Sequence, residues 1–188
     1  MEKRGKTIFR KAIAATALIA LVAVSVFFGY RFAERNWIYP KKYEKIVTRH
    51  ARTFGLEESL VYGLIKTESG FDKKAQSCAG ALGLMQLTPS TAEFVSRKLG
   101  TSEYDLFDAD TNVLFGCCYL WYLSRRFSDL STILAAYNAG EGNVALWLKD
   151  EKYSSDGITL YHIPYGETRF HVKKTLKYKA KYESLYGL

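Results

Sequence analysis

Apolar residues recur at helical spacing through most of the chain after residue 40. The pattern predicts helices at residues 41–54, 57–69, 88–99, 110–127, 129–137, 143–149 and 167–186. Residues 150–166, with Gly157 and Pro164, fit no helical period, and there we expect an irregular segment that could cover a cleft. Short strands in that segment are the alternative. The pattern as a whole predicts one all-α domain.

The first forty residues follow a different pattern. Residues 12–30 are nineteen uncharged, mostly apolar positions, about the length that crosses ~30 Å of hydrocarbon. Lys and Arg at positions 3, 4, 6, 10 and 11 precede them, which places this end in the cytoplasm by the positive-inside rule. We expect a cytoplasmic tail (1–11), a transmembrane signal anchor (12–30), a juxtamembrane spacer (31–40) and an extracytoplasmic domain (41–188).

A cleaved signal peptide is the alternative interpretation of this segment. Its apolar region would be long, and no small-residue cleavage site stands clearly at its end. Phe27, Phe28 and Tyr30 are instead typical of a membrane interface, and no lipobox cysteine occurs there. We therefore favour an uncleaved, single-pass anchor in a bacterial cell membrane.

Glu68 is a carboxylate in register with an apolar helix face. It follows Leu64 by four positions and Val61 by seven, so its side chain points at the core or a cleft. Burial and the negative helix end before Gly70 both disfavour the ionised form. A carboxylic acid that keeps its proton near neutral pH can act as general acid at a glycosidic oxygen. The alternative is a glutamate that reaches solvent or pairs with a nearby cation.

A glycine-rich connection follows the Glu68 helix, with glycines at positions 70, 80 and 83 that permit tight turns and close backbone approach. It ends in Met85 and Gln86. Fifty residues later, Tyr137 and Asn138 lie side by side at a helix end closed by a glycine. Each feature alone is typical of core packing plus a capping side chain.

Four motifs occur in order along the chain: Glu68-Ser69, Gly80-Ala81-Leu82-Gly83-Leu84-Met85-Gln86, Ala136-Tyr137-Asn138-Ala139-Gly140 and Ile163-Pro164-Tyr165-Gly166-Glu167-Thr168-Arg169. Together they resemble the soluble lytic transglycosylase catalytic domain, a relative of goose-type lysozyme. The resemblance covers roughly residues 43–186 and is specific because four motifs keep their order. It implies a lysozyme-like, all-α fold. One departure follows the last motif: His171 precedes Val172, where family members usually have tyrosine.

The resemblance implies a substrate and a reaction. Lytic transglycosylases cut peptidoglycan glycan strands at the β-1,4 bond between N-acetylmuramic acid and N-acetylglucosamine, and leave 1,6-anhydromuramic ends without using water. Glu68 would be the catalytic acid and then the base. Six positions match substrate-binding residues of the family: Ser77, Met85, Gln86, Tyr137, Asn138 and Glu167. The matches imply that Ser77 and Asn138 bind sugar polar groups, Met85 packs on the sugar, and Tyr137 orients the reacting centre.

Ordinary glycosidases need two carboxylates, and the motifs around Glu68 offer no obvious second one. Asp72 is expected to face solvent, and Glu167 resembles a polar-network residue of the family. A single carboxylate suffices if the substrate supplies its own 2-acetamido group and 6-hydroxyl. Two alternatives remain, a hydrolytic muramidase on the same fold and a non-catalytic peptidoglycan-binding scaffold. The presence of Glu68 argues against the scaffold.

Charge, histidines and cysteines change this picture little. The net charge is +8, but residues from 31 onward carry 22 basic and 18 acidic side chains. Basic residues between 169 and 181 are interpreted as a solvated helix face, not a nucleic-acid site. His50, His162 and His171 show no metal-ligand spacing, so no metal or cofactor is expected.

The three cysteines allow two interpretations. They are either buried thiols that act as small hydrophobes, or Cys78 forms a bridge with Cys117 or Cys118. Adjacent helical positions point about 100° apart, so only one of Cys117 and Cys118 could face Cys78.

Overall fold

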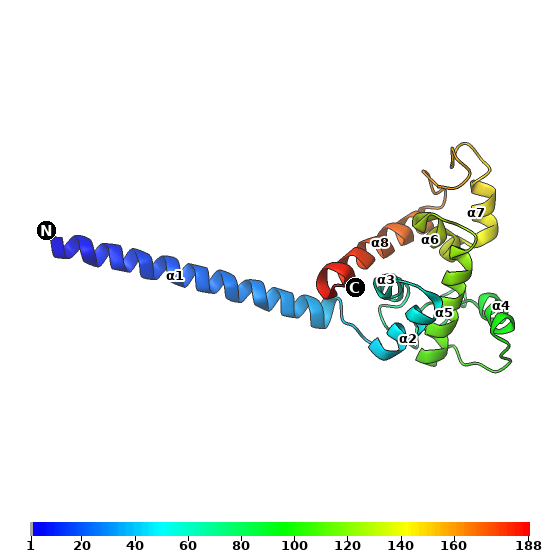
Figure 1. The fold of residues 1–188 in the computed structure, drawn as a ribbon, viewed down its shortest axis with the longest axis horizontal. Coiled ribbons are helices and arrows are strands. Elements are labelled where there is room, and N and C mark those ends of the chain that lie inside the picture. Colours follow the sequence, from blue (N-terminus) through cyan, green and yellow to red (C-terminus); the bar gives the residue numbers. More distant parts are fainter. Residues whose placement is uncertain (1) are drawn as a thin grey trace. The chain divides into compact units, whose positions relative to one another are not determined.

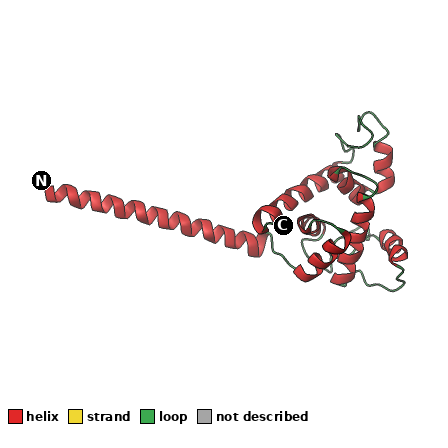
Figure 2. Cartoon of the chain, in the orientation of Figure 1, coloured by secondary structure: helices red, strands yellow, loops and turns green. Residues whose placement is uncertain are grey.

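The structure is a computed structural model that describes residues 2–188, with side chains for residues 11, 13 and 15–188. Figure 2 shows helices joined by loops, and the described residues contain no strand beyond isolated bridges of Leu82 with Gln76 and Leu87. The all-α class predicted from the sequence is confirmed. The chain divides into two compact units, Met1–Lys41 and Lys42–Leu188.

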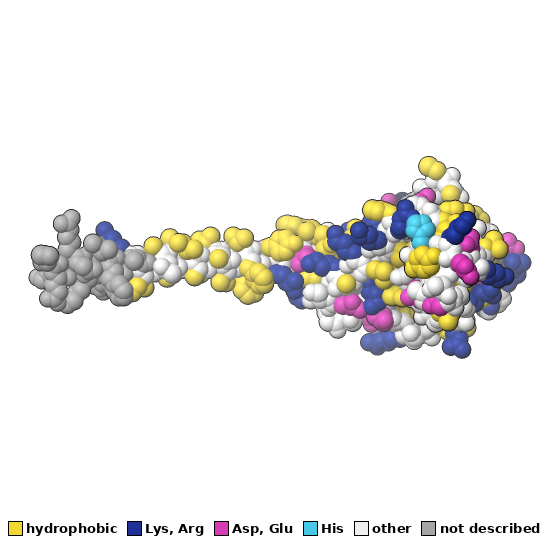
Figure 3. Space-filling model, turned by 90° about the horizontal axis from the view of Figure 1, so that it is seen from above, with side chains coloured by type: hydrophobic (Ala, Val, Ile, Leu, Met, Phe, Trp, Pro, Cys, Tyr) yellow, Lys and Arg dark blue, Asp and Glu magenta, His cyan; other side chains and the backbone are white. Residues whose placement is uncertain are grey.

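The first unit is a long helix, α1 (Glu2–Ala33), followed by a π-helical segment, η1 (Glu34–Ile38) (Figure 1). Residues Ala15–Ile38 are long and apolar enough to cross a membrane. Apolar side chains lie exposed along α1 in Figure 3, as expected for a helix whose natural surroundings are apolar. Helical structure thus continues beyond residue 30, where the predicted span ends. The basic side chains at positions 3, 4, 6 and 10 lie outside the described side chains.

The second unit contains seven helices within the described residues, and all correspond to segments predicted from the sequence. They are α2 (Glu44–Phe54), α3 (Glu58–Glu68), α4 (Pro89–Leu99), α5 (Ala109–Ser124), α6 (Leu130–Ala139), α7 (Glu141–Trp147) and α8 (Gly166–Tyr186). Local chemistry sets their ends. Thr88, Asp108 and Asp129 cap α4, α5 and α6, each side chain accepting a backbone N–H from the residue three positions later.

The helix α3 lies at the centre of this unit, and its side chains Val61, Leu64 and Ile65 are fully buried. Its most extensive contact is with α8. At Gly63 the two backbones approach so closely that a Cβ atom there would lie 2.8 Å from the backbone nitrogen of Lys179. Glycine is therefore required for this crossing. The crossing brings the end of α3 beside the first turns of α8.

The three cysteines are free, so of the two interpretations the one in which Cys78 forms a bridge is wrong. Cys78 is exposed on the loop after α3, whereas Cys117 and Cys118 are buried in α5. Cys118 packs in a cluster with Leu87 and Phe115. Burial raises the pKa of the Cys117 thiol well above its ordinary value, which keeps it protonated. The interpretation as small buried hydrophobes is correct for these two residues and not for Cys78.

Candidate active site

A cavity of about 230 Å³ opens where the end of α3 meets the following loop and the ends of α6 and α8. Its lining residues are Glu68, Ser77, Ala79, Ala81, Gln86, Leu87, Thr88, Thr91, Tyr119, Tyr137, Asn138 and Glu167. Six of the seven residues predicted from the motifs therefore lie together, although they come from distant parts of the chain. Met85 is the exception.

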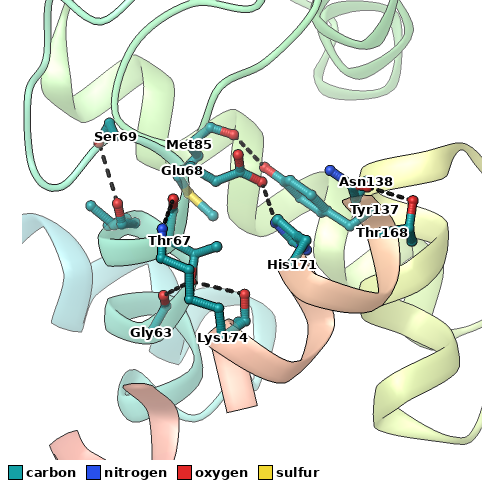
Figure 4. A network of polar contacts seen from close by, with 12 residues as sticks. Gly63, Thr67, Glu68, Ser69, Met85, Tyr137, Asn138, Thr168, His171 and Lys174 are labelled. Atoms are coloured by element: carbon teal, nitrogen blue, oxygen red, sulfur yellow. Dashed lines mark hydrogen bonds and ion pairs between the residues drawn. The ribbon is translucent and has the colours of Figure 1, made fainter. Parts of the chain in front are cut away.

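Glu68 is the last residue of α3, and its carboxyl group lies in the cavity wall with 13% of the side chain exposed. Its Oε1 atom lies 2.8 Å from Nε2 of His171, which reaches across from α8 (Figure 4). The prediction that Glu68 faces a cleft agrees with this placement. The sequence marked His171 only as a departure from a motif. Its position four residues after Glu167, on one helix face, was the signal that could have placed it near the site.

The loop that forms one wall is held by Asn112, a fully buried residue of α5. Its Oδ1 accepts the backbone N–H of Met85 at 2.8 Å, and its Nδ2 donates to the carbonyls of Leu82 and Leu106 at 3.0 and 2.8 Å. Gly83 has φ +75°, and a Cβ there would lie 2.2 Å from Asn112 Nδ2. Asn112 thus fixes the loop and requires a glycine. The sequence pattern did not single out Asn112, because it lies in a helix whose buried face is otherwise mostly apolar.

Met85 is fully buried and does not line the cavity, so the predicted packing of its side chain on the sugar is not what the structure shows. The sulfur fills the space beside Gly116 of α5, where a Cβ would lie 2.2 Å from Sδ. The carbonyl of Met85 instead accepts a hydrogen bond from the Tyr137 hydroxyl at 2.8 Å. A core position was available because Gly116 has no side chain.

Tyr137 lines the cavity from the end of α6. Burial, and then the nearby charge of Glu68, raise the pKa of Tyr137 well above its ordinary value. The phenol therefore stays neutral and acts as a hydrogen-bond donor to Met85. It supports the wall beside Glu68 and is not a proton source near neutral pH.

Three predicted binding residues make internal hydrogen bonds that fix their side chains. Ser77 Oγ accepts the N–H of Ala81 at 3.0 Å. Gln86 Nε2 donates to the carbonyls of Ala75 and Gly83 at 3.2 and 2.9 Å. Asn138 Oδ1 accepts the hydroxyl of Thr168 at 2.7 Å. Gln86 Oε1 and Asn138 Nδ2 are left as the acceptor and donor that a ligand in the cavity would meet.

Two further carboxylates were considered from the sequence, and they lie in different places. Glu167, in the first turn of α8, is exposed and lines the same cavity as Glu68. Asp72 is exposed, does not line the cavity, and accepts the N–H of Lys74 at 2.9 Å. The expectation that Asp72 faces solvent agrees with the structure. Glu167 is the second carboxyl group of the cavity.

A family model described as the transglycosylase SLT domain matches residues 45–160. The soluble lytic murein transglycosylase of Salmonella typhimurium is 33% identical over 155 residues, covering 79% of this chain and 24% of that protein. The membrane-bound lytic murein transglycosylase C of Mannheimia succiniciproducens is 34% identical over 128 residues, covering 61% and 36%.

Solved structures agree with these similarities. An inactive mutant of lytic transglycosylase Slt from Pseudomonas aeruginosa matches with a TM-score of 0.68 and 34% identity, covering 78% of this chain and 24% of that one. The 70-kDa soluble lytic transglycosylase from Escherichia coli matches with a TM-score of 0.70 and 31% identity, covering 79% and 25%. The lysozyme-like fold predicted from the motifs is confirmed. The chain spans about a quarter of the length of these soluble relatives.

Proposed function

This chain belongs to the transglycosylase SLT domain family, and we propose that it is a lytic transglycosylase acting on peptidoglycan glycan strands. The observation that carries the proposal is Glu68, a carboxyl group in the wall of a cavity that also presents the polar atoms of Gln86 and Asn138. This arrangement provides a proton donor and polar groups that can bind a sugar, which suffices for cleavage of a glycosidic bond when the substrate supplies the nucleophile.

In the first step, the Glu68 carboxyl donates its proton to the glycosidic oxygen, and the bond from that oxygen to the anomeric carbon of muramic acid breaks. The 2-acetamido group of the same sugar stabilises the electron-poor carbon. The 6-hydroxyl oxygen then bonds to that carbon, and its proton passes to the Glu68 carboxylate. The proton balance of the enzyme is restored without water, and the product has a 1,6-anhydro end. Because the nucleophile belongs to the substrate, proximity replaces a second catalytic side chain.

The other cavity residues would bind and orient the glycan. Gln86 Oε1 would accept a hydrogen bond from the sugar, because Gln86 Nε2 is already bonded within the protein. Asn138 Nδ2 would donate one to the sugar, because Asn138 Oδ1 is already bonded to Thr168. Ser77 stands in the loop wall, where its hydroxyl can donate to the sugar while it accepts from Ala81. Met85 lies outside the cavity and contributes indirectly, because its backbone carbonyl accepts the hydrogen bond of the Tyr137 hydroxyl.

Digestion of purified sacculi in heavy-oxygen water tests this reaction. Released muropeptides should carry anhydro ends that contain no label, because the sugar's own hydroxyl closes the ring. Mass spectrometry of the fragments measures both properties at once. Stoichiometric labelling of new reducing ends would contradict the proposal and establish hydrolysis.

Hydrolysis by a muramidase on the same fold is the second candidate, and the presence of Glu167 in the cavity is the observation that favours it. An exposed carboxylate could activate a water molecule for attack on the anomeric carbon. In that case Glu167→Gln would abolish labelled reducing ends. In a transglycosylase, the same variant still releases unlabelled anhydro fragments.

We also propose that α1 anchors the domain on the extracytoplasmic face of a bacterial membrane. Its apolar span and the membrane-bound name of one relative support this proposal, and the basic residues before the span support the orientation. The protein should remain with membranes after high-salt and alkaline washing and keep its N-terminus. A soluble species that begins beyond about residue 24 would show that the segment is a cleaved signal peptide.

A further inference from the structure

Glu68 has a buried polar neighbour that does not touch the cavity. His171 Nε2 lies 2.8 Å from Glu68 Oε1, and only 8% of the His171 side chain is exposed. Glu68 lines the cavity and His171 does not. A substrate can therefore meet the carboxyl group, while His171 acts on it from behind.

The contact is fixed by the packing of α3 on α8. Next to Glu68, the hydroxyl of Thr67 accepts a hydrogen bond from the hydroxyl of Thr175 at 3.0 Å, and its carbonyl accepts one from Lys174 Nζ at 3.3 Å (Figure 4). These bonds hold the last turn of α3 against the helix that carries His171. The imidazole therefore reaches Oε1 from a rigid frame, and no loop has to close.

The second ring nitrogen decides which protonation state this site favours. Among the described residues, Nδ1 of His171 is buried and has no hydrogen-bond partner. A proton on Nδ1 would be a buried donor without an acceptor, which both the charged imidazolium and the Nδ1–H tautomer would create. The neutral ring with its proton on Nε2 avoids this. In that form Nε2–H donates to Glu68 Oε1.

We propose that His171 is a positioning residue that holds Oε1 of Glu68 and leaves Oε2 as the oxygen that exchanges the proton with substrate. The proposal rests on the acid–base role of Glu68 stated above. Oε1 accepts the same hydrogen bond whether Glu68 is protonated on Oε2 or ionised. The carboxyl group therefore keeps one orientation as it gives up its proton and takes one back. The Nδ1–H tautomer would instead direct the carboxyl proton toward Nε2, away from the cavity.

Two variants at this position separate the hydrogen bond from the volume of the ring. His171→Phe keeps a ring and removes the donor. The kcat on soluble glycan strands should fall ~10- to 100-fold, the size of loss seen when a residue that orients a metal ligand is removed, and KM should stay within about threefold. His171→Gln restores an N–H donor at similar reach and should keep kcat within about fivefold of the native value. His50→Phe is the matched control, because it removes the donor from a similar histidine–carboxylate contact, that of His50 with Asp110 outside the cavity.

Three kinetic results would overturn the proposal: unchanged kcat in His171→Phe, a matching loss of kcat in folded His171→Gln, or an equal loss in His50→Phe. Circular dichroism and thermal unfolding establish that each variant is folded. If His171→Phe does not fold, His171→Gln and the spectroscopic measurement below decide.

The tautomer can be read without any turnover. Nitrogen-15 shifts of the His171 ring at pH 7 should show the proton on Nε2, and a proton on Nδ1 would overturn the proposal. This measurement also separates the two claims. If the native protein releases no fragments from sacculi, the proposed function fails, while the ring shifts still show whether Nε2 carries the proton that it would donate to Glu68 Oε1.

Discussion

Two buried histidines of this protein contact a carboxylate, and of these two carboxylates Glu68 lines the cavity described above and Asp110 does not. His171 lies 2.8 Å from Glu68, and His50 lies 2.9 Å from Asp110. The histidines are alike, with 8% and 7% of their side chains exposed. The carboxylates differ, because Glu68 is 13% exposed and Asp110 is 44% exposed.

The surroundings explain the difference between the two pairs. Asp110 lies in the first turn of α5, where the helix dipole favours a negative charge, and Nη1 of Arg49 lies 3.4 Å from its Oδ1. Asp110 thus contacts two side chains of α2, those of His50 and Arg49, and these contacts join α2 to α5. Glu68 ends α3, where the dipole opposes the charge. A histidine–carboxylate contact is thus no sign of a site by itself. The sign is that the carboxyl group of the pair lines a cavity, as that of Glu68 does.

The largest expected effect comes from removing the acid of one pair and not of the other. Glu68→Gln should lower the release of muropeptides at least ~10²- to 10⁴-fold, because the amide cannot donate and take back a proton. Asp110→Asn should leave the rate within about twofold, since it lies outside the cavity. Mass spectrometry of digested sacculi gives the rates. Wild-type-like release by Glu68→Gln would remove Glu68 from the reaction.

The helix α5 serves both regions, because Asp110 faces α2 and Asn112 holds the cavity loop. Asn112→Ala should lower the free energy of unfolding by about 2–4 kcal/mol, since three backbone groups lose a buried partner. Asn143→Ala removes only an exposed hydrogen bond to Ala139 and should change stability by less than about 0.5 kcal/mol. Urea unfolding of both variants provides the measurement. Equal stabilities would show that the loop does not depend on Asn112.

The pair outside the cavity should contribute to stability alone. His50→Phe keeps a ring but removes the donor, so it should lower the free energy of unfolding by about 1 kcal/mol, the usual net contribution of one hydrogen bond. Its kcat should equal that of the native protein. Urea titration and glycan-strand kinetics on one preparation test both statements. A fall in kcat without loss of stability would mean that this pair communicates with the cavity.

Asp156 is a third carboxylate, and its hydrogen bonds come mainly from backbone N–H groups and not from a histidine. The N–H groups of Thr159 and Ile158, with the hydroxyl of Ser154, lower the pKa of Asp156 to about 2. Because the pKa is lowered on folding, the ionised carboxylate stabilises the turn fully at pH values above about 4, the pKa of aspartate in the unfolded chain. This stabilisation is lost as the pH falls through about 2. Amide shifts of residues 154–159 should change over that interval. In Asp156→Ala the turn should already be altered at pH 5, with no further change on acidification.

Much of the fold could be predicted from the sequence because its signals are local. The helical period placed all seven helices of the domain, with the end of α3 just before Gly70 and the Thr88 cap of α4. The phase of Glu68 relative to Leu64 predicted that it points at the core or a cleft, and the motifs predicted which distant residues would accompany it. Periodicity, caps and motif order each depend on residues within a few turns of one another or on a resemblance.

The tertiary structure decided the rest, because contacts between distant segments depend on how closely helices pack. The approach of α3 and α8 at Gly63 brings His171 to Glu68, a contact that no local pattern contains. Gly116 leaves space for the Met85 side chain in the core. Met85, which was expected to pack on the sugar, is therefore buried behind the cavity wall. The sequence determined which side chains are present at the site. Only packing determined which of them meet the substrate and which hold their neighbours in place.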